Sequence, residues 1–151
     1  MTLVRVGFIP IPAGEEPGFD HADVYRAGRR MYVAHTGGNR VDVLDCENLT
    51  YLRALPALPG VAGVLIDEMH DLVFTSDRGA ARVSVFRCSD EELLGRVGVG
   101  SHPNGLAYDP DRRWLYSFNL GDPPGVGCTS SVVDLETMEV VATVPLAGRP
   151  R

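Results

Sequence analysis

The sequence lacks the features that mark membrane-spanning and disulfide-stabilised proteins. No apolar run approaches the roughly 18 residues that a membrane-crossing helix needs. The N-terminal run MTLVRVGFIPIP is broken by Arg5, Gly7 and prolines, and no small-residue cleavage site follows it. The three cysteines, Cys46, Cys88 and Cys128, form no C-x-x-C pair, which indicates neither a disulfide framework nor a zinc knuckle. We therefore expect a cytoplasmic protein with reduced thiols and no membrane partner.

Basic residues and helix signals are also scarce. The chain has 14 Lys and Arg against 20 Asp and Glu, and its net charge at pH 7 is −6. The basic residues are scattered, so no stripe is available to neutralise a phosphate backbone, and nucleic acid is not an expected partner. Only CSDEELLG, residues 88–95, could form a helical turn, and the repeat described next assigns it to a hairpin and a strand.

A repeat runs through most of the chain. MYVAHTGGNRVDVLD, residues 31–45, returns 41 to 42 positions later as LVFTSDRGAARVSVFR, residues 72–87, and more distantly as LYSFN and SSVVD. This alignment matches Met31 with Leu72 and Val41 with Val83. Each unit holds four short segments rich in Val, Leu, Tyr and Phe and bounded by Gly, Pro, Asn or Asp, which is the signal of strands. Four antiparallel strands per unit at this period predict the blades of a β-propeller.

The expected fold is therefore all-β, a partial β-propeller over residues 1–151. RVGFIPIPAG near the N-terminus resembles VVATVPLAG, the last strand of the third unit, which predicts a leading outer strand. In closed propellers such a strand completes the last blade and removes an exposed sheet edge. The predicted boundaries are 1–14 for the leading strand, 15–60 for blade one, 61–102 for blade two and 103–151 for blade three.

The second strands carry a family resemblance. The tetrapeptides YVAH, VFTS and YSFN each follow an innermost strand of P-x-G-x-x-x-D type, clearest in HPNGLAYDPDRRWLYSFN. This arrangement resembles the YVTN-repeat, YncE-like β-propellers, and the resemblance covers residues 20–151. Repeat one lacks the proline, and repeat three departs from the pattern through the insertion NLGDPPGVGCTS. The resemblance implies a ring of usually seven blades, with a ligand-binding face around the mouth of the central channel.

The repeat places polar residues at equivalent points on that face. One predicted ring lies where the innermost strands begin, and a second lies where the second strands end. The ligand-binding candidates on the two rings are His21 and Asn104, then His35, Ser76 and Asn119. Arg40 and Arg82, which both begin a third strand, join them; the alternative for this arginine pair is a solvated strand edge.

The segment GFDHAD supplies the densest set of metal-ligating side chains. Imidazole and carboxylate groups suit a divalent metal, and histidine also serves as a general base near neutral pH. The metal hypothesis names His21, Asp23 and His35. The competing interpretation is that these side chains bond loop backbone at a strand entrance. Asp77 and Arg78, in SDRGAAR, are expected to form a solvated ion pair in a turn.

Three functions remain open at this point. The first is a binding scaffold that presents a small-molecule, metal or protein site at the channel mouth. The second is a metal-dependent lactonase-like or lyase-like enzyme with His21 and His35 as acid and base candidates. The third is a structural interaction platform. No nucleophile elbow, H-E-x-x-H or Rossmann glycine run is present, so catalytic residues stay unknown and a divalent metal is the one cofactor considered.

Assembly follows from the number of blades. Three blades leave two open sheet faces, and exposed apolar faces of that size are rare on soluble monomers. If the chain is complete, we expect a homo-oligomer, such as two copies that close a six-bladed ring. If it is the N-terminal half of a longer propeller, which the ending AGRPR favours, further blades cover those faces.

Overall fold

The computed structural model describes residues 2–13 and 17–150, and these residues form three four-stranded antiparallel sheets. Each sheet is one blade, and its strands follow one another in chain order. Blade one contains β1 (Ala22–Tyr25), β2 (Arg30–His35), β3 (Arg40–Asp45) and β4 (Thr50–Leu55). Blade two contains β5 (Val61–Asp67), β6 (Leu72–Asp77), β7 (Arg82–Arg87) and β8 (Leu93–Gly98). Blade three contains β9 (Pro103–Asp109), β10 (Trp114–Asn119), β11 (Thr129–Asp134) and β12 (Glu139–Pro145).

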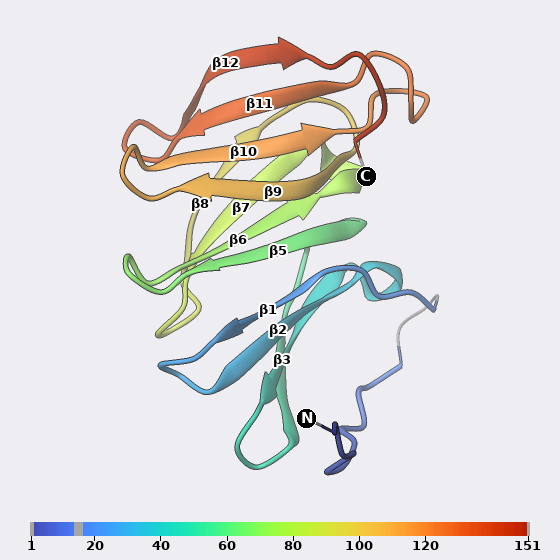
Figure 1. Cartoon of the computed structure of the whole chain (residues 1–151), viewed down its shortest axis with the longest axis vertical. Helices are drawn as coiled ribbons and strands as arrows, with labels where there is room; N and C mark the ends of the chain where they lie inside the picture. The colour runs from blue at the N-terminus through green and yellow to red at the C-terminus, as the bar shows by residue number, and fades with distance from the viewer. Residues whose placement is uncertain (1, 14–16, 151) are drawn as a thin grey trace.

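The blades stack with their first strands, β1, β5 and β9, side by side (Figure 1). Cross-blade bonds hold this inner row together: the His21 amide donates to the Ala62 carbonyl at 3.1 Å, and the Ile66 amide donates to Asp23 Oδ2 at 2.9 Å. The arrangement confirms the predicted all-β propeller. We call the end at which β1, β5 and β9 begin the mouth end, on the right in Figure 1, and the opposite end the turn end.

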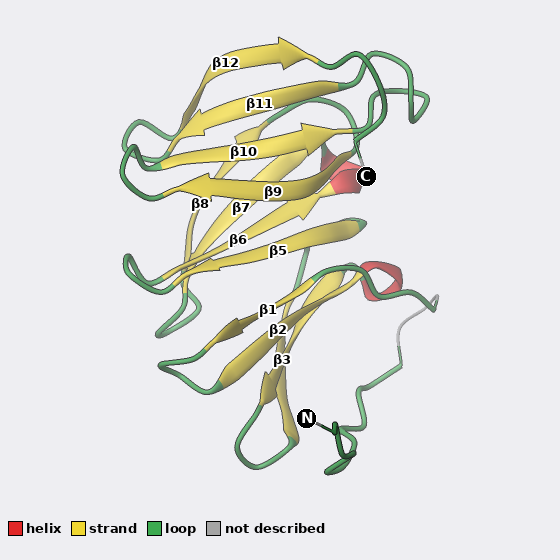
Figure 2. Cartoon of the chain, viewed as in Figure 1, coloured by secondary structure: helices red, strands yellow, loops and turns green. Residues whose placement is uncertain are grey.

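Two single-turn 3-10 helices lie at the mouth end, between the second and third strands of blades one and two (Figure 2). They are η1 (Thr36–Gly38) and η2 (Arg78–Ala80), and each ends on a residue in the left-handed region, Asn39 or Ala81. None of the helices among the described residues has the length and apolar character needed to cross a membrane.

The turns at the turn end repeat one chemistry. Each of the connections β1–β2, β5–β6 and β9–β10 contains a residue at positive φ, namely Arg29, Asp71 and Arg113. An aspartate at the end of a strand accepts amides of the turn that follows, as where Asp109 Oδ1 accepts the amides of Asp111 and Arg112 at 3.1 and 3.2 Å. These aspartates therefore act as local turn formers, which fixes where each strand stops.

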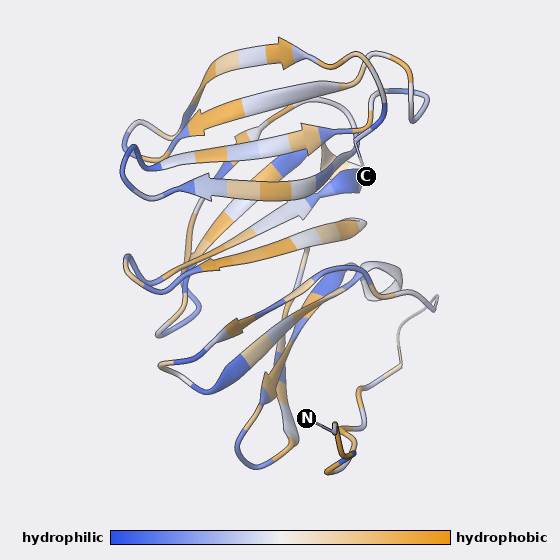
Figure 3. Ribbon diagram, in the orientation of Figure 1, coloured by the Kyte–Doolittle hydropathy of each residue, from blue (hydrophilic) through white to orange (hydrophobic). Residues whose placement is uncertain are grey.

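Apolar side chains fill the spaces between neighbouring blades. The core between blades one and two includes Tyr32, Leu58 and Val73, and the core between blades two and three includes Phe74, Leu115 and Val133. Figure 3 shows hydrophobic segments along the strands of all three blades and hydrophilic segments in the turns and within several strands. Because each blade buries one face against the next, burial between blades stabilises the stack.

The predicted alignment of the first two repeats needs a correction. The hairpins pair His35 with Arg40 and Asp77 with Arg82, so His35 corresponds to Asp77 and Met31 to Val73. The match of Met31 with Leu72 was wrong by one position, whereas the match of Val41 with Val83 is confirmed. All residues of β6 are buried, so its sequence shows no alternation that would have fixed the register.

The predicted leading strand also differs from the structure. Residues 2–13 form no strand and join no sheet, and the side chains of Leu3 and Phe8 are 89% and 74% exposed. A strand needs a neighbour to pair its backbone groups, and the pairing of this segment with a last blade in a closed ring stays a prediction. The ends of the predicted segment, Met1 and Gly14, lie outside the described residues.

Candidate functional site

The mouth end brings together side chains from all three blades. His21 directly precedes β1, and Asn104 is the second residue of β9, as the repeat predicted. Asp20 and Arg78, which the sequence analysis did not assign to a site, join them through hydrogen bonds. We call these four residues, Asp20, His21, Arg78 and Asn104, the mouth cluster.

His21 has a defined orientation. Its Nδ1 lies 2.7 Å from Asp20 Oδ1 and 3.3 Å from the carbonyl oxygen of Ala62, and both of these atoms are acceptors. Nδ1 must therefore carry the proton, which leaves the lone pair of neutral His21 on Nε2. The imidazole side chain is 51% exposed. It therefore presents a basic nitrogen that is not used in holding the ring in place.

Arg78 spans the cluster. Its Nη2 donates to Asp20 Oδ2 at 3.0 Å and also to Asn104 Oδ1, so one guanidinium from blade two contacts blades one and three. Arg78 Nε is buried and has no partner among the described residues. The guanidinium therefore has donor capacity that the described part of the protein does not use.

Asn104 is fixed from below by Ser76. The Ser76 hydroxyl donates to the carbonyl oxygen of Asn104 at 2.6 Å and accepts the amide of Gly63 at 2.7 Å. A Cβ atom at Gly63 would lie 2.5 Å from that same carbonyl oxygen, so only glycine allows this approach. Ser76 is fully buried, which makes it a supporting residue beneath the mouth and not a surface contact.

Asn104 also borders a hollow of about 480 Å³ that Leu120, Arg149 and Pro150 complete. Asn104 Oδ1 accepts a hydrogen bond from Arg78, whereas the Nδ2 donor of the same amide has no acceptor among the described residues. Asn104 and Arg149 thus line one hollow, Arg78 is bonded to Asn104, and Asp20 is the acidic group of the cluster. This charge balance favours a ligand with acceptor oxygens.

The second predicted ring lies inside the blades. His35, 3% exposed, places Nδ1 2.7 Å from Asp42 Oδ2, and Arg40 Nε donates to Asp42 Oδ1 at 2.8 Å. Phe19 covers the imidazole, with ring centroids 4.3 Å apart. These contacts link β2 to β3. They also offset the cost of burying the Asp42 carboxylate, because His35 and Arg40 both bond to it.

In blade two, Asp77 occupies the position that His35 has in blade one, and it bonds to different side chains. Asp77 is fully buried and accepts from Thr75 Oγ1 at 2.8 Å, Arg82 Nε at 2.8 Å and Ser84 Oγ at 2.6 Å. The predicted solvated pair of Asp77 with Arg78 is therefore wrong: Asp77 pairs with Arg82, and Arg78 reaches Asp20 instead. Arg82 matches Arg40 in sequence and in role, which confirms the predicted equivalence of the two.

Blade three completes the series with neutral groups. Asn119 is fully buried, and its Nδ2 donates to Thr129 Oγ1 and Ser131 Oγ, each at 3.0 Å, while Oδ1 accepts from Ser117. Each blade thus satisfies a buried polar group between its second and third strands. In blades one and two, an aspartate with an arginine two or five residues away, Asp42 with Arg40 and Asp77 with Arg82, is the sequence signal that could have revealed these buried clusters.

The three residues of the metal hypothesis, Asp23, His35 and His21, each bond to different partners. Asp23 Oδ1 accepts the Val24 amide at 2.7 Å, and Oδ2 accepts the Ile66 amide at 2.9 Å, so this carboxylate links β1 to β5. His35 is held by Asp42, and His21 by Asp20. Within residues 2–13 and 17–150, no three His, Cys, Asp or Glu side chains are grouped so that they could hold a metal ion. The metal hypothesis stays a prediction.

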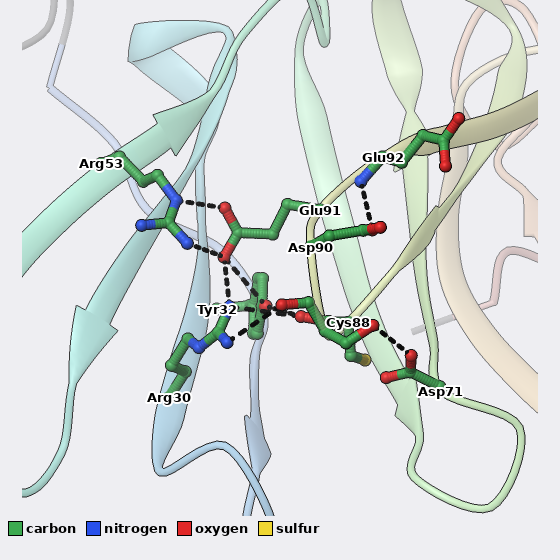
Figure 4. Close-up of polar contacts among 9 residues, drawn as sticks. Arg30, Tyr32, Arg53, Asp71, Cys88, Asp90, Glu91 and Glu92 are labelled. Carbon is green, nitrogen blue, oxygen red and sulfur yellow. Dashed lines mark hydrogen bonds and ion pairs between the residues drawn. The ribbon is translucent and has the colours of Figure 1, made fainter.

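The turn end holds a second polar cluster, which the sequence did not reveal (Figure 4). Glu91, in the turn between β7 and β8, receives Arg30 Nη1 at 2.7 Å, Arg53 Nη2 at 3.0 Å and the Tyr32 hydroxyl at 3.3 Å. Burial and the Glu91 charge raise the pKa of Tyr32, and burial raises the pKa of the neighbouring Cys88 thiol to about 12. The cluster joins blade two to blade one.

No protein-family model matches the chain. Among curated proteins, it is similar to the uncharacterized protein YncE of Salmonella typhimurium and of Salmonella typhi. Each is 26% identical over 103 residues, which cover 68% of this chain and 29% of the relative. The chain thus spans less than a third of the length of the curated relatives it matches.

Two solved structures resemble the model. Kuenenia stuttgartiensis hydrazine synthase superposes with a TM-score of 0.77 at 17% identity, over 89% of this chain and 38% of that one. The dihydro-heme d1 dehydrogenase NirN, in complex with DHE, gives a TM-score of 0.65 at 21% identity, over 91% of this chain and 27% of that one. At these identities the likeness concerns the fold alone. Together with the curated relatives, it supports a YncE-like β-propeller.

Proposed function

Taking the chain as a YncE-like β-propeller module, we propose that it is a binding scaffold whose mouth cluster holds a small carboxylate ligand. The observation that carries this proposal is the hydrogen bond from Arg78 to Asn104, which brings together two side chains that each keep a donor unused by the described protein. Arginine and amide donors match the planar acceptor pair of a carboxylate. His21, half exposed beside them, adds a third polar contact.

Calorimetric titration of the chain with succinate tests the proposal. We expect saturable binding that Asn104→Asp weakens by about tenfold or more, because the substitution puts an acceptor with a negative charge where a donor stood. Arg78→Gln should weaken it similarly. Arg112→Gln, at the exposed turn end, is the matched control and should leave binding unchanged. Absence of any succinate binding, or equal loss with the control, contradicts the proposal.

A second candidate function is acid–base catalysis by His21, which the orientation of its ring favours. Asp20 and the Ala62 carbonyl fix the proton on Nδ1, which leaves the lone pair on Nε2 of a side chain that is 51% exposed. An imidazole oriented by a carboxylate is the usual form of a general base. Turnover of a simple ester or lactone that His21→Gln abolishes would support this function; turnover unaffected by the substitution would exclude His21 from it.

We also propose that blade three is covered in the working assembly. Leu115 packs toward blade two, so by strand alternation Trp114, Tyr116 and Phe118 point to the opposite face of β10, where no sheet of the described chain packs. A further blade, from a second copy or from a longer chain, would bury them. Light scattering coupled to size exclusion should report a dimer or larger species for the isolated chain; a monomer would refute self-association.

A further inference from the structure

A second hollow lies between blades two and three and is independent of the mouth cluster. Its volume is about 550 Å³, which falls within the roughly 300–1,000 Å³ of small-molecule sites. The connection after β8, the β10–β11 loop and the strands β11 and β12 form its walls. Its polar lining includes Gly100, Ser101, Asp122, Thr129, Ser131 and Thr143. Both blades that enclose it are present in this chain.

One wall is a structure that only blade three has. The second and third strands are joined by residues 36–39 in blade one and 78–81 in blade two, but by residues 120–128 in blade three, at the upper right of Figure 1. Hydrogen bonds attach this longer loop to the β8–β9 connection: the Leu120 amide donates to the His102 carbonyl at 3.0 Å, and the Gly121 amide to the Ser101 carbonyl at 3.1 Å. The insertion therefore builds a fixed wall.

The floor carries hydroxyl groups with unused protons. Ser131 Oγ accepts from Asn119 Nδ2 at 3.0 Å and from the Gly100 amide at 3.2 Å, and Thr129 Oγ1 accepts from Asn119 Nδ2 at 3.0 Å. The partners are donors only, so neither hydroxyl proton has an acceptor among the described residues. Ser131 is 1% exposed, so the side chain that lacks this acceptor is buried at the floor of the hollow.

Glycine at position 100 lets the backbone reach this floor. A Cβ atom there would lie 2.6 Å from Asn119 Nδ2 and 2.7 Å from Thr129 Oγ1. No side chain could occupy that space without displacing the buried amide and hydroxyl groups. The close approach of the β8–β9 connection to β11 therefore depends on this residue.

The lining defines the ligand chemistry. The floor offers hydroxyl donors, Asp122 offers a carboxylate acceptor, and the hydroxyls of Ser101 and Thr143 serve as either. None of the lining residues is arginine, histidine or aromatic, so an anion would lack a counter-charge and a planar base would lack a stacking partner. An ammonium ligand would leave the floor donors without acceptors.

We propose that this hollow binds a small neutral polyhydroxylated molecule, a monosaccharide or a cyclic polyol. Each of its hydroxyl groups both donates and accepts, so one ligand satisfies the Ser131 and Thr129 protons and the Asp122 carboxylate together. The exposed Val126 and Val140 at the rim contact its carbon skeleton.

Saturation-transfer NMR on the chain tests the proposal with D-glucose, D-mannose and myo-inositol as probes, and with putrescine and succinate as charged comparisons. At least one of the three polyols should receive saturation. Thr143→Trp, which fills the hollow from the exposed strand β12, should abolish that signal, whereas Val141→Trp on the same strand should retain it. Asp122→Asn should weaken the affinity by about tenfold, and Asp111→Asn, at the turn end, should not change it.

Three outcomes overturn the proposal. None of the polyols receives saturation, or the polyol signal survives Thr143→Trp, or Thr143→Trp abolishes the signal of putrescine or succinate instead. Succinate binding that is lost in Asn104→Asp but kept in Thr143→Trp belongs to the mouth cluster. The two proposals can therefore fail separately.

Discussion

The two contacts between blades are built from different chemistry. Between blades one and two, four ion pairs supplement the apolar core, and they join Arg26 to Glu68, Arg30 and Arg53 to Glu91, and Arg78 to Asp20. Between blades two and three, no ion pair is present among the described residues, and the contact rests on apolar side chains and on hydrogen bonds such as Ser76 to Asn104. One repeat therefore supports two distinct ways of joining blades.

Two of the four ion pairs depend on a single turn. Glu91 has a positive φ of 62° in the connection from β7 to β8, and this conformation carries its side chain across to blade one. The equivalent turn of blade three holds Met138, whose methyl group packs on blade two near the Gly95 position. We call Glu91 with Arg30 and Arg53 the clamp. The clamp and the apolar contact of Met138 thus occupy corresponding places at the two junctions between blades.

The largest predicted effect is at the apolar junction. Phe74 is fully buried and packs on Tyr108, with ring centroids 5.0 Å apart. Phe74→Ala should lower the free energy of unfolding by about 3–5 kcal/mol, because it removes a buried aromatic side chain and leaves a cavity. Chemical denaturation measures the change. Phe74→Leu should cost clearly less, and equal losses in the two variants would contradict the packing account.

Removing the charge of the clamp should cost less. Glu91 is 5% exposed, and Glu91→Gln would leave Arg30 and Arg53 without their carboxylate, so we expect a loss of about 1–3 kcal/mol. Hydrogen exchange should show the loss first in β2 and β4. Glu92→Gln, at an exposed neighbour paired only with Arg87, should change stability by less than about 0.5 kcal/mol.

Alkaline pH should weaken both junctions through groups that stay protonated in the fold. The pKa is raised from 9.0 to about 12 for Cys88 and from 10.0 to about 12 for Tyr108, chiefly by burial. The unfolded chain loses these protons first, so stability is complete below pH 9 and falls as the pH rises toward 12. Denaturation midpoints measured across this range should show a smaller decline in Cys88→Ala than in the unmodified chain.

The smallest predicted effect compares the left-handed residues that end η1 and η2. Asn39 suits this conformation, whereas Ala81, at φ 46°, occupies it at a cost. Ala81→Asn should stabilise the chain by about 0.5–1 kcal/mol in thermal unfolding. Ala81→Val should destabilise it, because a branched side chain is strained there; a change of the same sign in both variants would refute the conformational explanation.

The sequence predicted the blades because strand signals are local. Val41 and Val83 recur at one offset, and turn residues bound each segment, so strand number and order followed directly. The register of β6 did not follow, because its residues are buried on both faces and do not alternate. Residues 2–13 form no strand in the described chain, and their role as an outer strand of a closed ring stays a prediction.

The candidate site was predicted only in part. His21 and Asn104 lie at the mouth as expected, because the repeat fixes where the innermost strands begin. Arg78 was missed, since its bonds reach residues 58 positions before it and 26 positions after it, and a periodic pattern carries no information about such contacts. The burial of His35, Asn119 and Ser76 was missed because strand polarity alone does not show which side chain fills the blade interior.

The mouth cluster, and not the buried ring that includes His35 and Asn119, is the proposed binding surface. Side-chain NMR of the chain during titration with succinate tests it most directly. We expect shifts at the Nε resonance of Arg78 and the Nδ2 resonance of Asn104, with the Nδ2 resonance of Asn119 and the ring of His35 unchanged. Shifts at Asn119 and His35 with Arg78 and Asn104 silent, or no shift at any of these groups, would contradict it.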